Sequence, residues 1–592
     1  MTYRSPVRDL VFSLTEAAGL DALIATGAFP DLDAETAGAV LDAAGQLADG
    51  VLEPLNRPGD LAGATYANGT VTAAPGFAAA YKAFSEGGWN GIAADPAFGG
   101  QGMPKALEQA SYECFHAANM AFGLCPMLTL AGIEALHAHG TERQKTHVLP
   151  KLISGAWSGA MVLTEPQSGS DLGTIRAMAK PNGDGTYALE GQKIFITWGD
   201  HDCADNIVHF VLARTPDAPA GTRGISLFLT SKFMIADDGK LGARNGFRPV
   251  GVEHKLGIHA SPTCVMAYEG ATAELVGELN QGLAHMFVMM NAARMAVGVQ
   301  GVAIAQRAWS RAFDYARERR QGRSAWTGEA SAPIFDHPDV RRMLAVTRAK
   351  IEAARGICLS GSAAGDLARH AKGDDERAFW KRREDLLTPI AKAWSTDIGV
   401  ESASIGVQVH GGMGFIEETG AAQHYRDARI APIYEGTNGI QAMDLAGRKL
   451  AGDGGKSAGE LITDIRATLA ALNGASDARL KTLGARLAAA TDAAEAAGKL
   501  LLERKGTPDA LAGAAGYLRL MAETTGGWIL AKGALAAERR LTKGGEDAAW
   551  LGGKLDLAAV YAEHVLAQTP SLLPSIAQGA APLEALHADA LA

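Results

Sequence analysis

Along the first third of the chain, apolar residues recur at the spacing of amphipathic helices. Ala and Leu follow this spacing over residues 36–52 and again over 106–120. Residues 57–76 are rich in Gly, Asn and Thr and predict a connecting loop, and the Gly-rich stretches 87–91 and 95–102 predict turns. The first third is therefore expected to consist of helices joined by loops.

One further helix is predicted in this part from its first turn. Thr141 and Gln144 have the spacing of a capping box, in which each side chain satisfies a free backbone N–H group at the start of a helix. Because a proline lacks the N–H group that a helix interior needs, this helix is expected to end near Pro150.

Near Trp157 the pattern changes from the helical period to short segments rich in β-branched and aromatic residues. Turn sequences such as Asn182-Gly183-Asp184-Gly185 separate these segments. A compact β domain is therefore expected in the middle of the chain. Its predicted strands are residues 187–197, 206–214, 224–230 and 263–268.

After residue 282 the helical period returns and continues to the end of the chain. Residues 286–309 are apolar on most faces and predict a buried helix, and 340–367 and 386–405 predict two more long helices. From about Lys456 the sequence is rich in Ala, with Leu at helical spacing, which predicts an appended helical bundle. Gly-containing breaks are expected in it at 506–508, 526–527 and 544–545.

The expected fold class is mainly α with a middle β domain. Four parts are predicted: an N-terminal helical domain (1–156), a β domain (157–281), a helical domain (282–455) and a C-terminal helical extension (456–592). With 592 residues and 47% hydrophobic content, the chain can bury a large core, and its length agrees with several structural units.

Charge and cysteine content exclude several classes of function. The net charge of −10 offers no basic surface for nucleic acid or for an anionic membrane. The five cysteines are scattered and never form a CxxC pair, so neither a metal site nor a disulfide framework is predicted. No signal peptide is apparent after Met1, and no later stretch looks long and apolar enough to span a bilayer. A cytoplasmic protein is expected.

Residues 430–441 place a carboxylate beside a glycine at a predicted loop-to-helix junction. Thr437 is a plausible N-cap for the helix that follows, and Gly436 has no Cβ, so a planar group could approach the backbone there. Glu435 is the candidate reacting residue, because a carboxylate beside free backbone N–H groups could accept a proton and stabilise an enolate. The alternative is that Glu435 only lies at the start of a helix and takes no part in a reaction.

Two segments of the β domain suit a planar, phosphate-bearing ligand. Residues 163–171 offer hydroxyl groups and a glycine-opened backbone, although such a loop can also be an ordinary turn. On the strand that includes residues 193–197, Phe195 and Thr197 have a spacing that could flank a flavin ring. Alternatively, both are core residues.

Taken together, these motifs resemble the acyl-CoA dehydrogenase family over roughly residues 36–450. The resemblance implies FAD held between the β domain and the following helical domain and across a subunit interface. The six matching motifs are 163–171, 193–197, 319–322, 408–412, 426–427 and 434–437.

The resemblance also implies a reaction. Glu435 removes the α-proton of an acyl-CoA while the β-hydrogen passes to FAD as a hydride, which gives a trans-2-enoyl-CoA. Some members carry the base on the long helix at the position of Ala293, and alanine cannot act as a base, which favours Glu435.

Further site residues are implied position by position. Arg294 has an alternative role, which is to hold a structural carboxylate. The implied substrate contacts are Ser170, Asn291, Arg294 and Gly436, and the implied FAD contacts are Leu163, Thr164, Gly169, Ser170, Phe195, Thr197, Arg319, Gln408, Gly412, Thr437 and Gly439.

Within the family, the long chain and its opening residues 3–12 resemble bacterial members that oxidise 3-methylmercaptopropionyl-CoA during dimethylsulfoniopropionate breakdown. Alternatives are a short- or long-chain fatty acyl-CoA dehydrogenase and a DNA-associated flavoprotein of the same fold. A homodimer is implied because Arg319 and Gln408 would act across an interface, and an electron-transferring flavoprotein is the implied electron acceptor.

Overall fold

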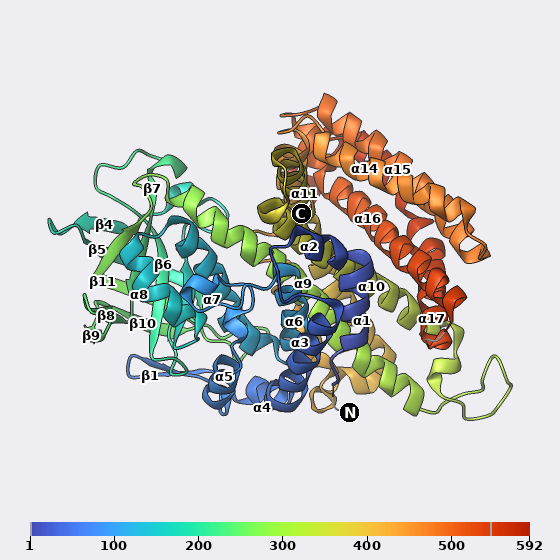
Figure 1. The fold of residues 1–592 in the computed structure, drawn as a ribbon, viewed down its shortest axis with the longest axis horizontal. Helices are drawn as coiled ribbons and strands as arrows, with labels where there is room; N and C mark the ends of the chain where they lie inside the picture. Colours follow the sequence, from blue (N-terminus) through green and yellow to red (C-terminus); the bar gives the residue numbers. More distant parts are fainter. Residues whose placement is uncertain (1–2, 545–546) are drawn as a thin grey trace.

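The computed structural model describes residues 3–544 and 547–592. Figure 1 shows a sheet region at one end of the molecule and the C-terminal helices at the other, with the remaining helices between them. The N-terminal helices are α1 Val7–Phe12, α2 Leu20–Thr26, α3 Ala34–Leu47, α4 Asn56–Ala62, α5 Phe77–Glu86, α6 Lys105–Ala118, α7 Met120–His139 and α8 Glu142–Ile153.

The N-terminal region is helical, as the sequence predicts, but the predicted loop 57–76 is wrong. It contains the end of α4 and a hairpin of β1 Thr65–Ala67 and β2 Thr70–Thr72. Asn68 and Gly69 both have positive φ, the conformation of the tight turns that join two antiparallel strands. The flanking threonines favour an extended backbone, so a segment that reads as a loop forms a small sheet.

Helix α8 begins as predicted and ends later than predicted. Both hydrogen bonds of the capping box between Thr141 and Gln144 are present. The helix continues through Pro150 to Ile153, so the predicted end at the proline is wrong. The buried side chains Leu149 and Leu152 hold the last turn against the core, which explains why the proline does not end it.

The β domain is a seven-stranded sheet in which five strands close into a circuit. Strand β11 pairs with β5 and with β7, and β7 pairs with β6, so the circuit β11–β5–β4–β6–β7 returns to its starting strand. The predicted strands are present, while β3, β4, β10 and the β8–β9 hairpin are additional. The strands are β3 Trp157–Val162, β4 Met178–Pro181, β5 Tyr187–Thr197, β6 Asn206–Arg214, β7 Ile225–Ser231, β8 Phe233–Ile235, β9 Leu241–Arg244, β10 Phe247–Val252 and β11 Thr263–Val276.

Three long helices form the centre of the molecule. Helix α9 (Gly282–Glu318) packs along α11 (Asp374–His410), and also contacts α6, α7 and α10 (Pro338–His370). Two short helices follow, α12 Ala421–Ala428 and α13 Asn438–Asp444, and the latter continues as a π-helical turn, η11 Leu445–Leu450.

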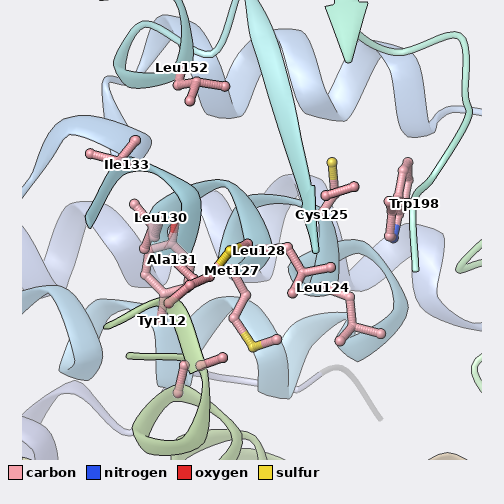
Figure 2. Packing of buried hydrophobic residues seen from close by; sticks show 14 of the residues in the cluster. Tyr112, Leu124, Cys125, Met127, Leu128, Leu130, Ala131, Ile133, Leu152 and Trp198 are labelled. Atoms are coloured by element: carbon pink, nitrogen blue, oxygen red, sulfur yellow. The ribbon is translucent and has the colours of Figure 1, made fainter. Parts of the chain in front are cut away.

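Two helices are long and apolar enough to cross a membrane, so the expectation that no segment would be is wrong. They are α7 and α9, and 89% and 72% of their most apolar windows are buried inside the fold. Figure 2 shows α7 side chains, among them Leu124 and Cys125, packed between neighbouring elements that include Trp198. In this structure their apolar surface is covered by protein.

The C-terminal extension is a helical bundle that packs mainly on α10, α11 and α13. One predicted break is wrong, because Gly526 and Gly527 lie inside α16. A Cβ atom at Gly526 would lie 2.6 Å from the Tyr561 hydroxyl, so glycine here permits close helix packing. The predicted break at 544–545 falls partly outside the described residues. The helices are α14 Lys456–Gly474, α15 Ala478–Glu503, α16 Pro508–Lys543, α17 Ala548–Tyr561, α18 Leu572–Gln578 and α19 Ala581–Glu584.

Helix α9 joins two hydrophobic cores. One core unites the N-terminal helices and the sheet and includes Met289 of α9. The other unites α10, α11 and the C-terminal bundle and includes Met295 and Val299 of α9. Because α9 is buried from both sides over much of its length, residues on it and on the loops that pack against it are held firmly.

Candidate functional site

Glu435 lies in the short loop between α12 and α13. Both Glu435 and Gly436 have positive φ, at 57° and 79°, and this backbone conformation is uncommon for a glutamate. Thr437 caps α13, because its hydroxyl accepts a hydrogen bond of 3.2 Å from the backbone N–H of Ile440. The predicted cap and helix start are confirmed. Residues 434–437 are called the base loop below.

Polar side chains from two helices hold the base loop in this conformation. The buried ammonium group of Lys392, on α11, donates hydrogen bonds to the Gly436 carbonyl (2.8 Å) and to Asn438 Oδ1 (3.0 Å). Gln441 Nε2, on α13, donates to the Glu435 carbonyl at 3.2 Å. These contacts fix the backbone on both sides of the Glu435 side chain. Lys392 and Gln441 were not among the predicted site residues.

The Glu435 carboxylate itself has no hydrogen-bond donor among the described residues. Burial raises the pKa of Glu435 to about 7, while the nearby charges of Arg294 and Lys392 lower it. Burial also lowers the pKa of Lys392 to about 7. A partly buried carboxylate that titrates near neutrality and is not paired suits a general base.

Helix α9 brings Arg294 next to the base loop, because a Cβ atom added at Gly436 would lie 3.7 Å from Arg294 Nη2. Arg294 Nη1 lies 3.3 Å from Asp444 Oδ2, and both side chains are buried. Arg294 thus pairs with a structural carboxylate, that of Asp444, which is the alternative role that the sequence left open for it. Asn291 instead lines a cavity between α9 and the helices α6, α7 and α10. Ala293 is fully buried and has only a methyl group.

The loop 163–171 is anchored by a buried ion pair. Lys193 Nζ lies 2.8 Å from Glu165 Oε1 and also donates to the carbonyls of Leu163 and Leu212, each at 2.8 Å. Glu165 accepts two more hydrogen bonds from backbone N–H groups, those of Arg176 and Ala177. Both charged residues lie in motifs singled out from the sequence, 163–171 and 193–197, but no role was predicted for them. The signal in the sequence was a lysine in the predicted strand 187–197 and a glutamate in the adjoining loop 163–171.

Phe195 lies beside this loop with its ring uncovered. The side chain is 57% exposed, φ is +60°, and β5 and β11 change register here, so the alternative of a core residue is wrong for Phe195. The backbone N–H of Ile194 donates to the Thr164 carbonyl at 3.0 Å, which joins strand and loop. A strained, exposed aromatic residue beside an open loop is typical of a binding surface.

The remaining predicted residues of the β domain border the same surface. Leu163, Thr164 and Thr197 are half-buried, whereas Gly169 and Ser170 are exposed. A Cβ atom added at Gly169 would have no neighbour within 4 Å, so the loop backbone is open to a ligand. This arrangement fits a planar cofactor with a phosphate-bearing tail, such as FAD.

The predicted cross-subunit residues lie on other elements. Arg319 follows the end of α9 and contacts Gln321 at 3.1 Å, and Gln408 is exposed near the end of α11. Gly412 follows α11, and the nearby Phe415 is 85% exposed. In the described part of the chain, no hydrogen bond or ion pair joins these residues to the loop 163–171. Gly439 is exposed at the start of α13.

No group of three or more His, Cys, Asp or Glu side chains that could hold a metal ion occurs among the described residues. The groups present at the site are the Glu435 carboxylate and amide and hydroxyl groups, beside the open surface of the β domain.

Four family models match successive parts of the chain. They are described as the acyl-CoA dehydrogenase N-terminal domain (residues 39–156), middle domain (160–271) and C-terminal domain (280–450), followed by an acetyl-CoA dehydrogenase C-terminal-like domain (461–587). The matches follow the order of the regions in the fold.

Two curated proteins match nearly the whole length. A 3-methylmercaptopropionyl-CoA dehydrogenase of Ruegeria pomeroyi is 46% identical, over 96% of this chain and 97% of its own. A broad-specificity linear acyl-CoA dehydrogenase of Mycobacterium tuberculosis is 35% identical, over 95% of both chains. Among solved structures, an acyl-CoA dehydrogenase of Bacillus anthracis complexed with FAD has a TM-score of 0.71 and 21% identity, over 95% of this chain and 90% of its own.

Proposed function

The chain belongs to the acyl-CoA dehydrogenase family, and we propose that it oxidises 3-methylmercaptopropionyl-CoA to methylthioacryloyl-CoA, with Glu435 as the base. The enzyme is an FAD-dependent oxidoreductase that acts on an acyl-CoA. The observation that carries the role of Glu435 is its unpaired carboxylate, whose burial raises its pKa to about 7. The 46% identical relative, a 3-methylmercaptopropionyl-CoA dehydrogenase, supports the substrate. A place in dimethylsulfoniopropionate breakdown is part of the same proposal.

In the proposed mechanism, Glu435 accepts the proton from the α-carbon of the thioester. The α-proton of a thioester is weakly acidic, so the carboxylate must be desolvated and held in place. Lys392 and Gln441 provide the second condition by fixing the carbonyls of Gly436 and Glu435. The backbone N–H of Glu435 is the proposed donor to the thioester oxygen, which gains charge as the proton leaves.

The cofactor surface is proposed to be the loop 163–171 with Phe195 and Thr197. Thr164 and Ser170 supply hydroxyl groups there, and the Lys193–Glu165 ion pair keeps the loop in place. When bound, FAD supplies the acceptor for the β-hydrogen, which leaves as a hydride.

We also propose a homodimer that works with an electron-transferring flavoprotein in a reducing cytoplasm. The exposed positions of Arg319, Gln408 and Gly412, with Phe415 beside them, support contacts to a second subunit. The five cysteines are free thiols, which supports a reducing compartment.

The test is anaerobic bleaching of the bound flavin by three substrates: 3-methylmercaptopropionyl-CoA, butyryl-CoA and palmitoyl-CoA. Fast bleaching by the first two and slow bleaching by the third is the expected result. If palmitoyl-CoA reacts fastest, the enzyme is a long-chain dehydrogenase, an alternative that the broad-specificity relative supports. If none of the three bleaches the flavin, the proposed function is wrong.

A further inference from the structure

A cleft of about 380 Å³ lies where the N-terminal segment meets the last part of α9. Tyr3 and Arg4 line it from the N-terminal segment, and residues between Arg307 and Asp314 line it from α9. Its volume is within the range of small-molecule sites, which is about 300–1,000 Å³. None of the described residues that line it belongs to the base loop or to the loop 163–171. It is called the arginine cleft below, after Arg4, Arg307 and Arg311 in its wall.

Arg307 is buried, and part of its guanidinium group is not used by the fold. The residue is only 7% exposed. Its Nη2 donates to Glu53 Oε1 at 2.8 Å, and its Cζ lies 4.9 Å from the centre of the Tyr3 ring. Its Nη1 is buried too, but has no hydrogen-bond partner in the described part of the chain. Such a group is costly, because it has lost its hydrogen bonds to water without replacing them.

Arg311, one turn after Arg307, has no hydrogen bond or ion pair with any described residue. Its Nε is buried without a partner. Its guanidinium packs on Gly420, where an added Cβ atom would lie 3.3 Å from the Arg311 Cζ. Burial lowers the pKa of Arg311, and the positive charges of Arg307 and Arg57 lower it further, while Glu53 raises it. Neighbouring cations therefore destabilise the charged form of Arg311, and an anion in the cleft would relieve this.

The arginine cleft carries more positive than negative charge. Arg4 is exposed, and it too has no hydrogen bond or ion pair with a described residue. Asp314 is the one acid among the described residues that line the cleft, and Arg307 also binds Glu53 behind it. Three arginines thus face two acids, in a chain whose net charge is −10. Guanidinium groups held close together without enough acid between them repel one another unless an anion binds.

We propose that the arginine cleft binds the phosphate group of a small organic phosphate. A phosphate monoester carries a charge near −2 and several strong acceptor oxygens, which guanidinium groups match with paired N–H donors. The donors are the free Nη1 of Arg307 and the guanidinium groups of Arg311 and Arg4. The cleft is larger than a phosphate group, and Ser310 and Asp314 offer polar groups to hydroxyls on the rest of the ligand.

The first test is calorimetric titration of the full-length, FAD-containing protein with inorganic phosphate and with glycerol 3-phosphate, at constant ionic strength. Saturable binding of both is expected, with the ester bound more tightly, whereas acetate should not bind. Arg311→Gln should weaken both about tenfold or more, because hydrogen bonds between charged groups are lost. The matched control is Arg486→Gln on α15, which removes the same charge from an exposed pair with Glu563 and should bind like wild type.

Two outcomes of this titration would overturn the inference. One is the absence of saturable phosphate binding to the wild type. The other is equal binding by wild type and Arg311→Gln, which would mean that phosphate binds elsewhere. Arg4→Gln should also weaken binding, and since Arg4 is exposed, it keeps the test decisive even if Arg311→Gln does not fold.

The second test is thermal unfolding in phosphate-free buffer, which separates a binding residue from a structural one. Arg311→Gln removes a cation that has no partner, so its Tm is expected to equal or exceed that of wild type. Added phosphate should raise the Tm of wild type and leave that of Arg311→Gln nearly unchanged. A clearly lower Tm of Arg311→Gln without phosphate would show that Arg311 supports the fold, and the inference would be wrong.

The inference does not rest on the proposed function, and the two fail in different ways. FAD content and flavin bleaching by butyryl-CoA should be the same in wild type, Arg311→Gln and Arg4→Gln. Loss of FAD from Arg311→Gln would assign the cleft to the cofactor and overturn the inference. If phosphate binds as expected but no acyl-CoA bleaches the wild type, the proposed function alone fails.

Discussion

Two glutamates on loops of this protein, Glu165 and Glu435, each have a buried lysine nearby. They differ in their hydrogen-bond partners and in the direction in which their pKa values shift. Glu165 pairs with Lys193 at 2.8 Å and accepts two backbone N–H groups. Burial would raise the pKa of Glu165, but these partners hold it below its ordinary value. Glu435 has Arg294 and Lys392 near it, but none of the described residues donates a hydrogen bond to its carboxylate. Burial raises its pKa to about 7.

The difference shows that a direct ion pair with its hydrogen bonds, rather than a lysine that is merely nearby, decides what a buried carboxylate can do. Lys193 binds its glutamate directly and makes it an anchor for a loop. Lys392 binds the backbone of the base loop and leaves the carboxylate of Glu435 free. A carboxylate whose lone pairs are all occupied is stable but inert, whereas an unpaired one can take a proton from a substrate.

The largest effect is expected from Glu435→Gln. Loss of the proton acceptor should lower the rate of flavin bleaching by acyl-CoA about 10²–10⁴-fold, the usual contribution of a general base. Bound FAD, measured by its absorbance, should not change. The matched control is Glu401→Gln on α11, an exposed glutamate that pairs with Lys350. Bleaching of Glu435→Gln at the wild-type rate would mean that Glu435 is not the base.

The second-largest effect is expected from Glu165→Gln, which changes the paired glutamate of the two. It leaves the buried ammonium group of Lys193 without its counter-charge, which should cost about 3–5 kcal/mol of unfolding free energy. FAD content should fall because the loop 163–171 loses its anchor. Chemical denaturation and flavin absorbance measure the two outcomes.

Its control is Glu190→Gln, which breaks the ion pair with Lys180 on the surface of the sheet. Both side chains of that pair are about half exposed, so the expected cost is only about 0–1 kcal/mol. If Glu165→Gln and Glu190→Gln are equally stable, the buried pair does not anchor the loop.

The smallest effect is a change of stability with pH. The pKa of Glu435 is about 7 in the folded chain and about 4.3 in an unfolded one, so the folded state binds this proton more tightly. Its contribution to stability is therefore complete below about pH 4 and is lost as the pH rises through about 7. Glu435→Gln does not titrate and should gain about 1–3 kcal/mol relative to wild type between about pH 5 and pH 8.

Unfolding free energies of the wild type and Glu435→Gln at these two pH values provide the measurement. The difference between the two proteins removes the contributions of other buried acids, such as Asp366 and Asp427, whose pKa values burial also raises. A difference that is the same at both pH values would show that the pKa of Glu435 is ordinary.

Local features of the fold follow from local sequence. The cap at Thr437 and the capping box at Thr141 depend on residues three positions apart, and both are present as expected. The strands at 187–197 and 206–214 have the predicted bounds. Expectations were wrong where a distant contact outweighs a local preference, as at Gly526, whose close approach to Tyr561 keeps α16 continuous.

By itself, the sequence determined the order of helical and β regions and the motif that contains Glu435. Only the tertiary structure decided which carboxylate is left unpaired and which buried polar groups meet. Lys392 is 44 residues from Gly436, and His116 is 184 residues from Gln300. The physical reason is that desolvation and hydrogen bonding depend on which groups are adjacent in space, and no local pattern of residue types records that.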